Sequence, residues 1–199
     1  RKNFKELLND VNFSSTNFFI DEAFIDFIRN GEDLSFKHFE SDRVIIIRAF
    51  TKFFGIPGLR LGYSICYNKK WVSTANNLKE PWTINTFAAS CGEILLNSNK
   101  YIEKTYKTLE KEKNRMLNGL TKIKNIRVFK SESNFLLIKL MEISGTELYN
   151  KLLEKGFLIR RCENFNFLDD SYVRIAIKDK KSNKNFIKAI NKITKNRNV

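Results

Sequence analysis

The sequence contains few of the residues that mark extended or irregular chains. Only 8 of its 199 residues are glycine and 2 are proline, whereas 42% are hydrophobic and 13% are aromatic. This composition excludes collagen-like, low-complexity and wholly disordered chains, which lack the apolar side chains needed for a core. The length suffices for one large domain, or for one domain and part of another. We therefore expect a folded protein with a substantial hydrophobic core.

Cysteine and histidine are also scarce. The three cysteines, Cys66, Cys91 and Cys162, are widely spaced, and His38 is the single histidine. Zinc sites place cysteine and histidine ligands at short, regular spacings, so this sequence predicts no metal site. An odd number of scattered cysteines is typical of a reducing compartment, and we expect a cytoplasmic protein.

Long hydrophobic runs are absent. No stretch approaches the ~20 apolar residues that cross a bilayer, and the first ten residues lack the apolar centre of a signal peptide. The sequence therefore predicts no association with a membrane. Because the chain begins at Arg1, within a segment of helical spacing, we expect it to be the C-terminal portion of a longer protein.

Positive charge is in excess: 36 lysines and arginines stand against 22 aspartates and glutamates, for a formal net charge of +14. Such a surplus can attract nucleic acid, anionic lipid or small phosphorylated and carboxylated ligands. Lysines recur along residues 104–113 and 178–188 at intervals typical of solvated helix faces. No stacking-aromatic motif or recognition-helix pattern accompanies them, so we expect no specific nucleic-acid partner.

Continuous apolar runs in the first part of the chain indicate strands. A helix is predicted over residues 2–11, followed by a short buried strand at 18–20 and further strands at 44–47 and 59–66. The run at 44–47 is β-branched throughout and does not alternate, as is typical of a strand covered on both faces of a parallel sheet. Strands with helical connections predict an α/β fold.

The second part of the chain has a different pattern. A long helical stretch is predicted over about residues 85–120, with an apolar face, and short strands and helices follow it. The predicted strands are 126–129, 135–138, 157–160 and 172–177, and the predicted helices are 146–155, ending at Gly156, and one that Ser182 caps. We therefore divide the chain into the end of a large domain (1–80), a helical connection (81–120) and a small α+β domain (121–199).

The residues with the strongest chemical signal surround Lys52. This lysine comes directly after a predicted buried strand, where an α/β sheet presents its ligands. Thr51 precedes it and Arg60 follows eight residues later, next to Pro57 and Gly58. An ammonium, a hydroxyl and a guanidinium could converge on one anion there, and a phosphate would suit the three groups.

Asp21 is the candidate acidic partner, because it ends an apolar strand. A carboxylate there is costly unless it meets a cation or a protonated ring nitrogen. Simpler interpretations exist for each residue alone: Lys52 as a solvated charge, and Asp21 with Glu22 as an acidic pair at a helix N-terminus. The pattern of the whole segment favours a binding site.

Together these residues resemble the fold-type-I pyridoxal-phosphate enzymes of the aminotransferase class. Within the class, the chain is most similar to the threonine-phosphate decarboxylases and close to the histidinol-phosphate aminotransferases. The blocks that carry the resemblance are residues 21–27 (DEAFIDF), 51–63 (TKFFGIPGLRLGY), 81–85 (PWTIN), 158–165 (LIRRCENF) and 172–176 (YVRIA). The resemblance implies the end of the large cofactor domain, with a mainly parallel sheet and helices, and a small C-terminal α+β domain.

The resemblance also implies a role for each residue. Lys52 would bind the aldehyde of pyridoxal 5'-phosphate and later return a proton to the substrate carbon. Asp21 would bind the protonated pyridine nitrogen, and Thr51 and Arg60 would hold the cofactor phosphate.

Two arginines would bind the substrate. Arg174 would hold its carboxylate as a bidentate fork, and Arg160 would lie beside its phosphate or carboxylate. Either arginine could instead be an ordinary salt-bridge residue on a strand. The reaction implied is decarboxylation of O-phospho-L-threonine to (R)-1-amino-2-propanol phosphate, in cobalamin biosynthesis, by a homodimer. The alternative is an aminotransferase such as histidinol-phosphate aminotransferase.

The chain departs from the pattern of the class at two positions. Ala49 stands where the class usually has a serine that contacts the cofactor phosphate, and Phe24 stands where the aminotransferases tend to have a tyrosine. Phenylalanine at position 24 modestly favours the decarboxylase. Because other walls of the cofactor site lie outside residues 1–199 by this resemblance, these residues alone are expected to bind the cofactor weakly.

Overall fold

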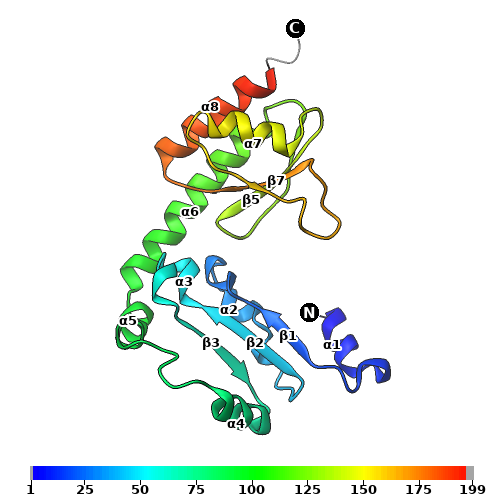
Figure 1. Cartoon of the computed structure of the whole chain (residues 1–199), viewed down its shortest axis with the longest axis vertical. Coiled ribbons are helices and arrows are strands. Elements are labelled where there is room, and N and C mark those ends of the chain that lie inside the picture. Colours follow the sequence, from blue (N-terminus) through cyan, green and yellow to red (C-terminus); the bar gives the residue numbers. More distant parts are fainter. Residues whose placement is uncertain (1, 196–199) are drawn as a thin grey trace. The chain divides into compact units, whose positions relative to one another are not determined.

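The structure of the chain is a computed structural model that describes residues 2–195. Its contacts group into two compact units, Arg1–Asn99 and Lys100–Val199, coloured blue to green and green to red in Figure 1. Residues 81–99 thus group with the first unit and residues 100–120 with the second. The division into 1–80, 81–120 and 121–199 stays a prediction.

The first unit is built on a sheet of three strands. The strands are β1 (Phe18–Asp21), β2 (Val44–Ala49) and β3 (Gly62–Cys66). The α-helices are α1 (Lys2–Asn9), α2 (Gly31–Leu34), α3 (Phe50–Phe53), α4 (Lys69–Leu78) and α5 (Thr86–Leu96). Short 3-10 turns lie at Val11–Phe13, Ile25–Phe27, Phe36–His38 and Pro57–Leu59.

The sheet of the first unit is mixed. Its order is β1-β2-β3, with β1 parallel to β2 and β3 antiparallel to β2. The register aligns Asp21 with Ile47 and Ala49 with Gly62. The ends of β1 and β2 and the start of β3 therefore lie at one edge of the sheet, and Figure 1 shows α3 at this end and α4 at the other.

One face of this sheet is covered. Val44 and Ile46 are buried in a cluster with Leu8 of α1, whereas Phe19 is 66% exposed and Ile47 is 44% exposed. The prediction that strand 44–47 is covered on both faces is therefore wrong for the described chain. The strand predicted as buried at 18–20 is half-buried, because Phe18 and Ile20 are partly covered and Phe19 is exposed. The cause is that most of the packing in this unit is on one face, while the other face has only local contacts such as the stacking of Trp71 of α4 on Phe19, so burial alternates along each strand.

The second unit is an α+β arrangement. Its strands are β4 (Ile126–Val128), β5 (Phe135–Leu140), β6 (Arg160–Arg161) and β7 (Tyr172–Ala176), and its helices are α6 (Asn99–Leu120), α7 (Gly145–Leu153) and α8 (Lys180–Lys195). The strands form an antiparallel sheet in the order β4-β5-β7-β6.

Alternate residues of β5 and β7 form the core of the second unit. Leu136, Ile138 and Val173 are fully buried and pack against apolar residues of α6, α7 and α8. The residues between them, Arg174 among them, lie on the opposite face of the sheet because side chains alternate along a strand. This face is the one that carries the candidate arginines.

Two element ends differ from expectation. The predicted helical stretch 85–120 is two helices, because α5 ends at Leu96 and α6 begins at Asn99. Ser182 lies inside α8, and the carboxylate of Asp179 accepts hydrogen bonds from the backbone N–H groups of residues 181 and 182 instead. Asp179 precedes the helix and satisfies these donors, so Ser182 is not the cap. Gly156 follows α7 with a φ of +77°, as predicted for a glycine that ends a helix.

A buried carboxylate joins α6 to α8. Glu112 Oε2 accepts hydrogen bonds from Asn183 Nδ2 and from Arg115 Nε, each at 3.0 Å. Burial raises the pKa of Glu112, but the hydrogen bonds from Asn183 and Arg115 outweigh it and lower this pKa below its ordinary value. Ionised Glu112 therefore stabilises the fold above the unfolded-state pKa of 4.5, and this stability is lost as the pH falls through the folded-state pKa.

The substitution Glu112→Gln is expected to lower the free energy of unfolding at pH 7 by about 1.5 kcal/mol, the loss of a hydrogen bond to a charged group. The difference between the two proteins should shrink below about pH 4.5. Urea unfolding followed by circular dichroism at pH 7 and pH 3 measures both effects. Glu110→Gln, at an exposed position of the same helix, is the control. A difference that is the same at both pH values would contradict the assigned linkage.

Candidate active site

The predicted residues of the first unit gather at one edge of its sheet. Asp21 ends β1, and Thr51 and Lys52 lie in α3, directly after β2. Phe50 N donates to Leu61 O at 3.2 Å, which places Arg60 beside the start of α3. The register alone therefore brings together four residues that are separated by up to 39 positions in the sequence.

Asp21 has one carboxylate oxygen available for a ligand. Its Oδ1 accepts a hydrogen bond from the N–H of Ala23 at 2.8 Å, which fixes the orientation of the carboxylate. Its Oδ2 receives no donor from the described residues. Asp21 is exposed, on the face of the sheet that Phe19 and Ile47 also share. The carboxylate is therefore oriented by the backbone and open on one side.

Lys52 is exposed, while its neighbours in α3 are buried. Thr51 is 9% exposed and Phe53 is 4% exposed, so α3 is held to the unit by these side chains. The ammonium of Lys52 lies 5.8 Å from the centre of the Phe24 ring, within the range of a cation–π contact. Phe24 follows β1 by three residues, so this contact joins the segment after Asp21 to α3.

Arg60 has an unusual backbone conformation. Its φ of +55° is in the left-handed region, at the end of the 3-10 turn Pro57–Leu59. Its NH1 donates to Pro57 O at 3.1 Å, and the side chain is exposed. The remaining donors of the guanidinium have no partner among the described residues and could bind an anion.

Arg160 and Arg174 lie side by side in the second unit. They are paired across β6 and β7, so their side chains share one face of the sheet. Arg174 lies over the ring of Phe135, 4.7 Å from its centre, and Arg160 NH2 donates to Asn164 Oδ1 at 2.9 Å. Among the described residues, neither guanidinium has an ion-pair partner, which removes the salt-bridge interpretation for both. Like charges opposite each other are unfavourable, and a bound anion would offset the repulsion.

The sequence interpretation missed a buried ion pair behind this edge. Glu22 and Arg48 are 5% and 3% exposed, and Arg48 donates to Glu22 Oε2 through Nε at 3.0 Å and NH2 at 2.9 Å. Glu22 is thus not part of an acidic pair at a helix N-terminus. The sequence contained a signal for this pair: Arg48 directly follows the β-branched run 44–47 within the same strand, and a charge in a buried strand requires a partner of opposite charge.

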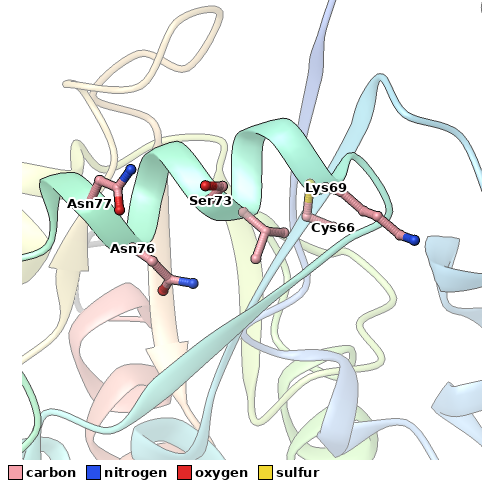
Figure 2. Close-up of a pocket in the computed structure, with 6 residues that line it drawn as sticks. Cys66, Lys69, Ser73, Asn76 and Asn77 are labelled. Carbon is pink, nitrogen blue, oxygen red and sulfur yellow. The ribbon is translucent and has the colours of Figure 1, made fainter.

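A pocket of about 390 Å³ lies elsewhere in the first unit. Figure 2 shows its labelled side chains along α4 and at the end of β3, among them Cys66, Lys69 and Ser73. The register places Cys66 opposite Ile45, at the start of β2. The pocket is therefore at the opposite edge of the sheet from Lys52 and is separate from the candidate site.

Within residues 2–195, no group of three or more histidine, cysteine, aspartate or glutamate residues could hold a metal ion. No helix in this range is both long and apolar enough to cross a membrane.

Comparison with known proteins gives a consistent match over most of the chain. The family model described as aminotransferase class I and II matches residues 1–190. The chain is 39% identical over 178 residues to the "Putative threonine-phosphate decarboxylase" of Caldanaerobacter subterraneus subsp. tengcongensis, which covers 86% of this chain and 47% of that protein. It is 32% identical over 174 residues to the histidinol-phosphate aminotransferase of Methanocaldococcus jannaschii, which covers 87% and 46%.

A solved structure extends the similarity to the fold. The histidinol-phosphate aminotransferase from Clostridium acetobutylicum matches with a TM-score of 0.93 at 40% identity, over 98% of this chain and 59% of that one. The chain spans about half the length of the curated relatives that it matches. Decarboxylases and aminotransferases are thus both among its near relatives.

Proposed function

We propose a function for this protein from one premise: the chain belongs to the family of class I and II aminotransferases. Its fold is part of the fold of these enzymes, and its cofactor is pyridoxal phosphate. We propose which residues hold the cofactor, which reaction the protein catalyses and which substrate it binds.

The donor set at the edge of the sheet fits this cofactor. Pyridoxal phosphate has an aldehyde, a basic ring nitrogen and a phosphate, which call for an amine, a carboxylate and cationic or hydroxyl donors. Lys52, Asp21, and Arg60 with Thr51 supply these groups, and the register places all four at one edge. The open Oδ2 of Asp21 and the unpartnered donors of Arg60 are the single observation that carries the proposal.

The proposed reaction is the decarboxylation of O-phospho-L-threonine to (R)-1-amino-2-propanol phosphate, a step of cobalamin biosynthesis. When bound, the cofactor supplies an electron sink for the negative charge that develops at the substrate α-carbon. Arg174 would hold the carboxylate through two parallel N–H bonds, and Arg160 would bind the phosphate. Asp21 would keep the ring nitrogen protonated, and Lys52 would deliver a proton to the α-carbon once carbon dioxide has left.

Orientation of the substrate separates this reaction from transamination. When bound, the cofactor would weaken whichever bond of the substrate α-carbon the protein holds in position for cleavage. A carboxylate held in that position leaves as carbon dioxide, whereas a hydrogen leaves as a proton and leads to amino transfer. The arginines select between these outcomes, since a misplacement of ~1 Å changes the geometry of attack enough to alter rates about 10²-fold.

Transamination of histidinol phosphate, or of another amino acid, is the second candidate. The observation that favours it is the 40% identity to the Clostridium acetobutylicum enzyme. Phe24 favours the decarboxylase instead, because its ring has no hydroxyl to reach the cofactor from its position beside Lys52.

One experiment separates the two reactions. The protein expressed from its complete gene is supplied with O-phospho-L-threonine, and released carbon dioxide is measured beside the formation of glutamate from 2-oxoglutarate with histidinol phosphate as the amino donor. Carbon dioxide without amino transfer supports the decarboxylase. Amino transfer with little carbon dioxide would replace it with the aminotransferase, and neither product would reject both.

Introducing a serine at position 49, where the chain has Ala49, is expected to strengthen cofactor binding. Ala49 is the N-cap of α3 and offers no side-chain hydrogen bond there. Ala49→Ser is expected to tighten cofactor binding by up to about tenfold, because a hydroxyl that donates to the phosphate contributes roughly 1.5 kcal/mol. Titration of the cofactor followed by visible absorbance measures the change. Unchanged or weaker binding would show that this hydroxyl does not reach the phosphate.

We further propose a homodimer in the cytoplasm that acts on a phosphorylated amino acid. The three free cysteines suit a reducing compartment. Phe87 and Ile94 of α5 are 78% and 66% exposed, and large exposed apolar side chains mark surfaces that another polypeptide covers. Sedimentation equilibrium of the complete protein tests the dimer, and a monomer at micromolar concentration would reject it.

A further inference from the structure

The Glu22–Arg48 pair lies directly behind the two segments that carry the candidate site. Glu22 immediately follows Asp21, and Arg48 precedes Lys52 by four residues. The last backbone contact between β1 and β2 runs from Glu22 N to Ile47 O, at 2.8 Å. Among the described residues, no backbone hydrogen bond joins these two segments beyond this one, and the side chains of Glu22 and Arg48 continue the connection.

The pair and the candidate site lie on opposite faces of the sheet. Arg48 is buried on the same face as Val44 and Ile46, as alternation along β2 requires. Asp21 is exposed on the other face, and Glu22, one residue on, is turned back into the interior. A shift of Glu22 would therefore rotate or displace the backbone that presents Asp21.

Every oxygen of Glu22 is engaged. Its Oε1 accepts from Phe36 N at 2.7 Å, and its Oε2 accepts from Ser35 Oγ at 2.8 Å in addition to Arg48. These bonds come from two different segments, residues 35–36 and Arg48, so they fix the carboxylate in one position. The hydrogen bonds to both carboxylate oxygens of Glu22 hold this part of the chain in one position, which a favourable charge interaction alone would not do.

Arg48 is held equally firmly. Its NH1 contacts the carboxylate of Glu32, which also pairs with Lys37. Burial opposes the charge, but the hydrogen bonds of Glu32, Tyr63 and Glu22 outweigh it and raise the pKa of Arg48 above its ordinary value. Arg48 is thus a permanent cation within a group of carboxylates. Burial, together with Glu32 and Glu22, raises the pKa of the neighbouring Asp26, although the charge of Arg48 opposes this shift.

Stability alone does not account for such a pair. Apolar side chains of similar volume stabilise a protein as well as a buried ion pair or better, because the desolvation of two charges offsets their attraction. What the charges add is a fixed geometry: two donors of one guanidinium on one oxygen. This geometry occurs at the point where β1 and β2 end and the candidate ligands begin.

We propose that Glu22 and Arg48 are positioning residues that fix the segments of Asp21 and Lys52 relative to each other, and so set how these two residues hold the cofactor. The inference rests on the proposed function. It assigns the buried pair a role in cofactor binding, exerted through the backbone rather than by contact.

The test compares Glu22→Gln and Arg48→Lys with the parent, all expressed from the complete gene. Three measurements are made: the dissociation constant of pyridoxal phosphate, the midpoint of the pH titration of the bound cofactor's visible absorbance, and the unfolding temperature. Both variants are expected to bind the cofactor at least about tenfold more weakly. The titration midpoint should move by about one pH unit, because the distance from Asp21 to the cofactor changes.

Two further variants separate positioning from stability. Glu112→Gln removes a carboxylate as buried as Glu22, 4% exposed, from a pair with Arg115 in the second unit. It should lower the unfolding temperature and leave cofactor affinity within about twofold. The double variant Glu22→Leu/Arg48→Met removes both charges at once, and it is the arm to use if the single variants do not fold. The double variant should bind the cofactor at least about tenfold more weakly than the parent, as is expected of the single variants.

The outcomes distinguish the inference from the function. If the parent binds no cofactor, or borohydride reduction labels a lysine other than Lys52, the proposed function fails and the inference falls with it. If the parent is labelled at Lys52 but the variants keep its affinity and titration midpoint, only the inference is overturned. The same holds if affinity falls for Glu112→Gln as much as for Glu22→Gln.

Discussion

Lys52→Ala is expected to abolish both carbon dioxide release and amino transfer, with each rate reduced on the order of 10⁴-fold or more. The amine holds the cofactor and also moves the proton at the α-carbon, and alanine can do neither. The cofactor's visible absorbance and its borohydride-trapped adduct on residue 52 should disappear as well. Steady-state rates, absorbance spectra and peptide mass spectrometry measure the three effects on the protein expressed from its complete gene.

Lys70→Ala is the matched control for this substitution. Lys70 is another exposed lysine of the same unit, but it belongs to α4, at the opposite edge of the sheet. Its replacement should change neither the rates nor the spectrum. The assignment of Lys52 would be wrong if Lys52→Ala retained the trapped adduct at another lysine, or if both variants lost activity equally.

Arg174→Gln is expected to lower kcat/KM by roughly 10³-fold, because two charge-assisted hydrogen bonds to the substrate carboxylate, each worth about 1.5–3 kcal/mol, are lost together. Arg174→Lys should recover part of this loss, since lysine keeps the charge and loses the planar fork. The ratio of carbon dioxide to amino-transfer product should also change, because the arginine orients the bond that breaks. Product analysis beside steady-state kinetics gives both values.

Arg127→Gln is the control for Arg174. Arg127 is also a strand arginine of the second unit that lies over a phenylalanine, 5.1 Å from the centre of the Phe129 ring. Loss of this similar contact should leave kcat/KM unchanged. If Arg174→Gln changes only the stability of the protein, then the guanidinium over Phe135 is a packing residue and Arg160 remains the candidate for the carboxylate.

Much of the second unit was predictable because its two central strands are short segments rich in apolar and β-branched residues. Strands 135–138 and 172–177 appear as β5 and β7, and Gly156 ends α7 as its conformational freedom predicts. Strand 157–160 was misplaced, because the strand is only the two residues Arg160–Arg161. A pair so short carries no periodic signal in the sequence.

The first unit was predicted less well where burial depends on what covers a sheet. The run at 44–47 indicated a strand covered on both faces, and the structure covers one face. The hydrophobicity of a side chain indicates that the side chain favours burial. It does not indicate which elements are available to pack against it. The buried partners Glu22 and Arg48 were missed for the same reason, since they are 26 residues apart and only the strand pairing brings them together.

The sequence by itself determined the residue types of the site: a lysine and a threonine after a buried strand, an arginine beside a proline and glycine turn, and an acid at the end of another strand. These follow from local order along the chain, and they identified the family. Only the tertiary structure decided that Asp21 and Glu22, neighbours in sequence, turn to opposite faces of the sheet, one open to a ligand and one buried against Arg48. Strand register fixes that choice, and register arises from contacts between distant segments, which no local pattern contains.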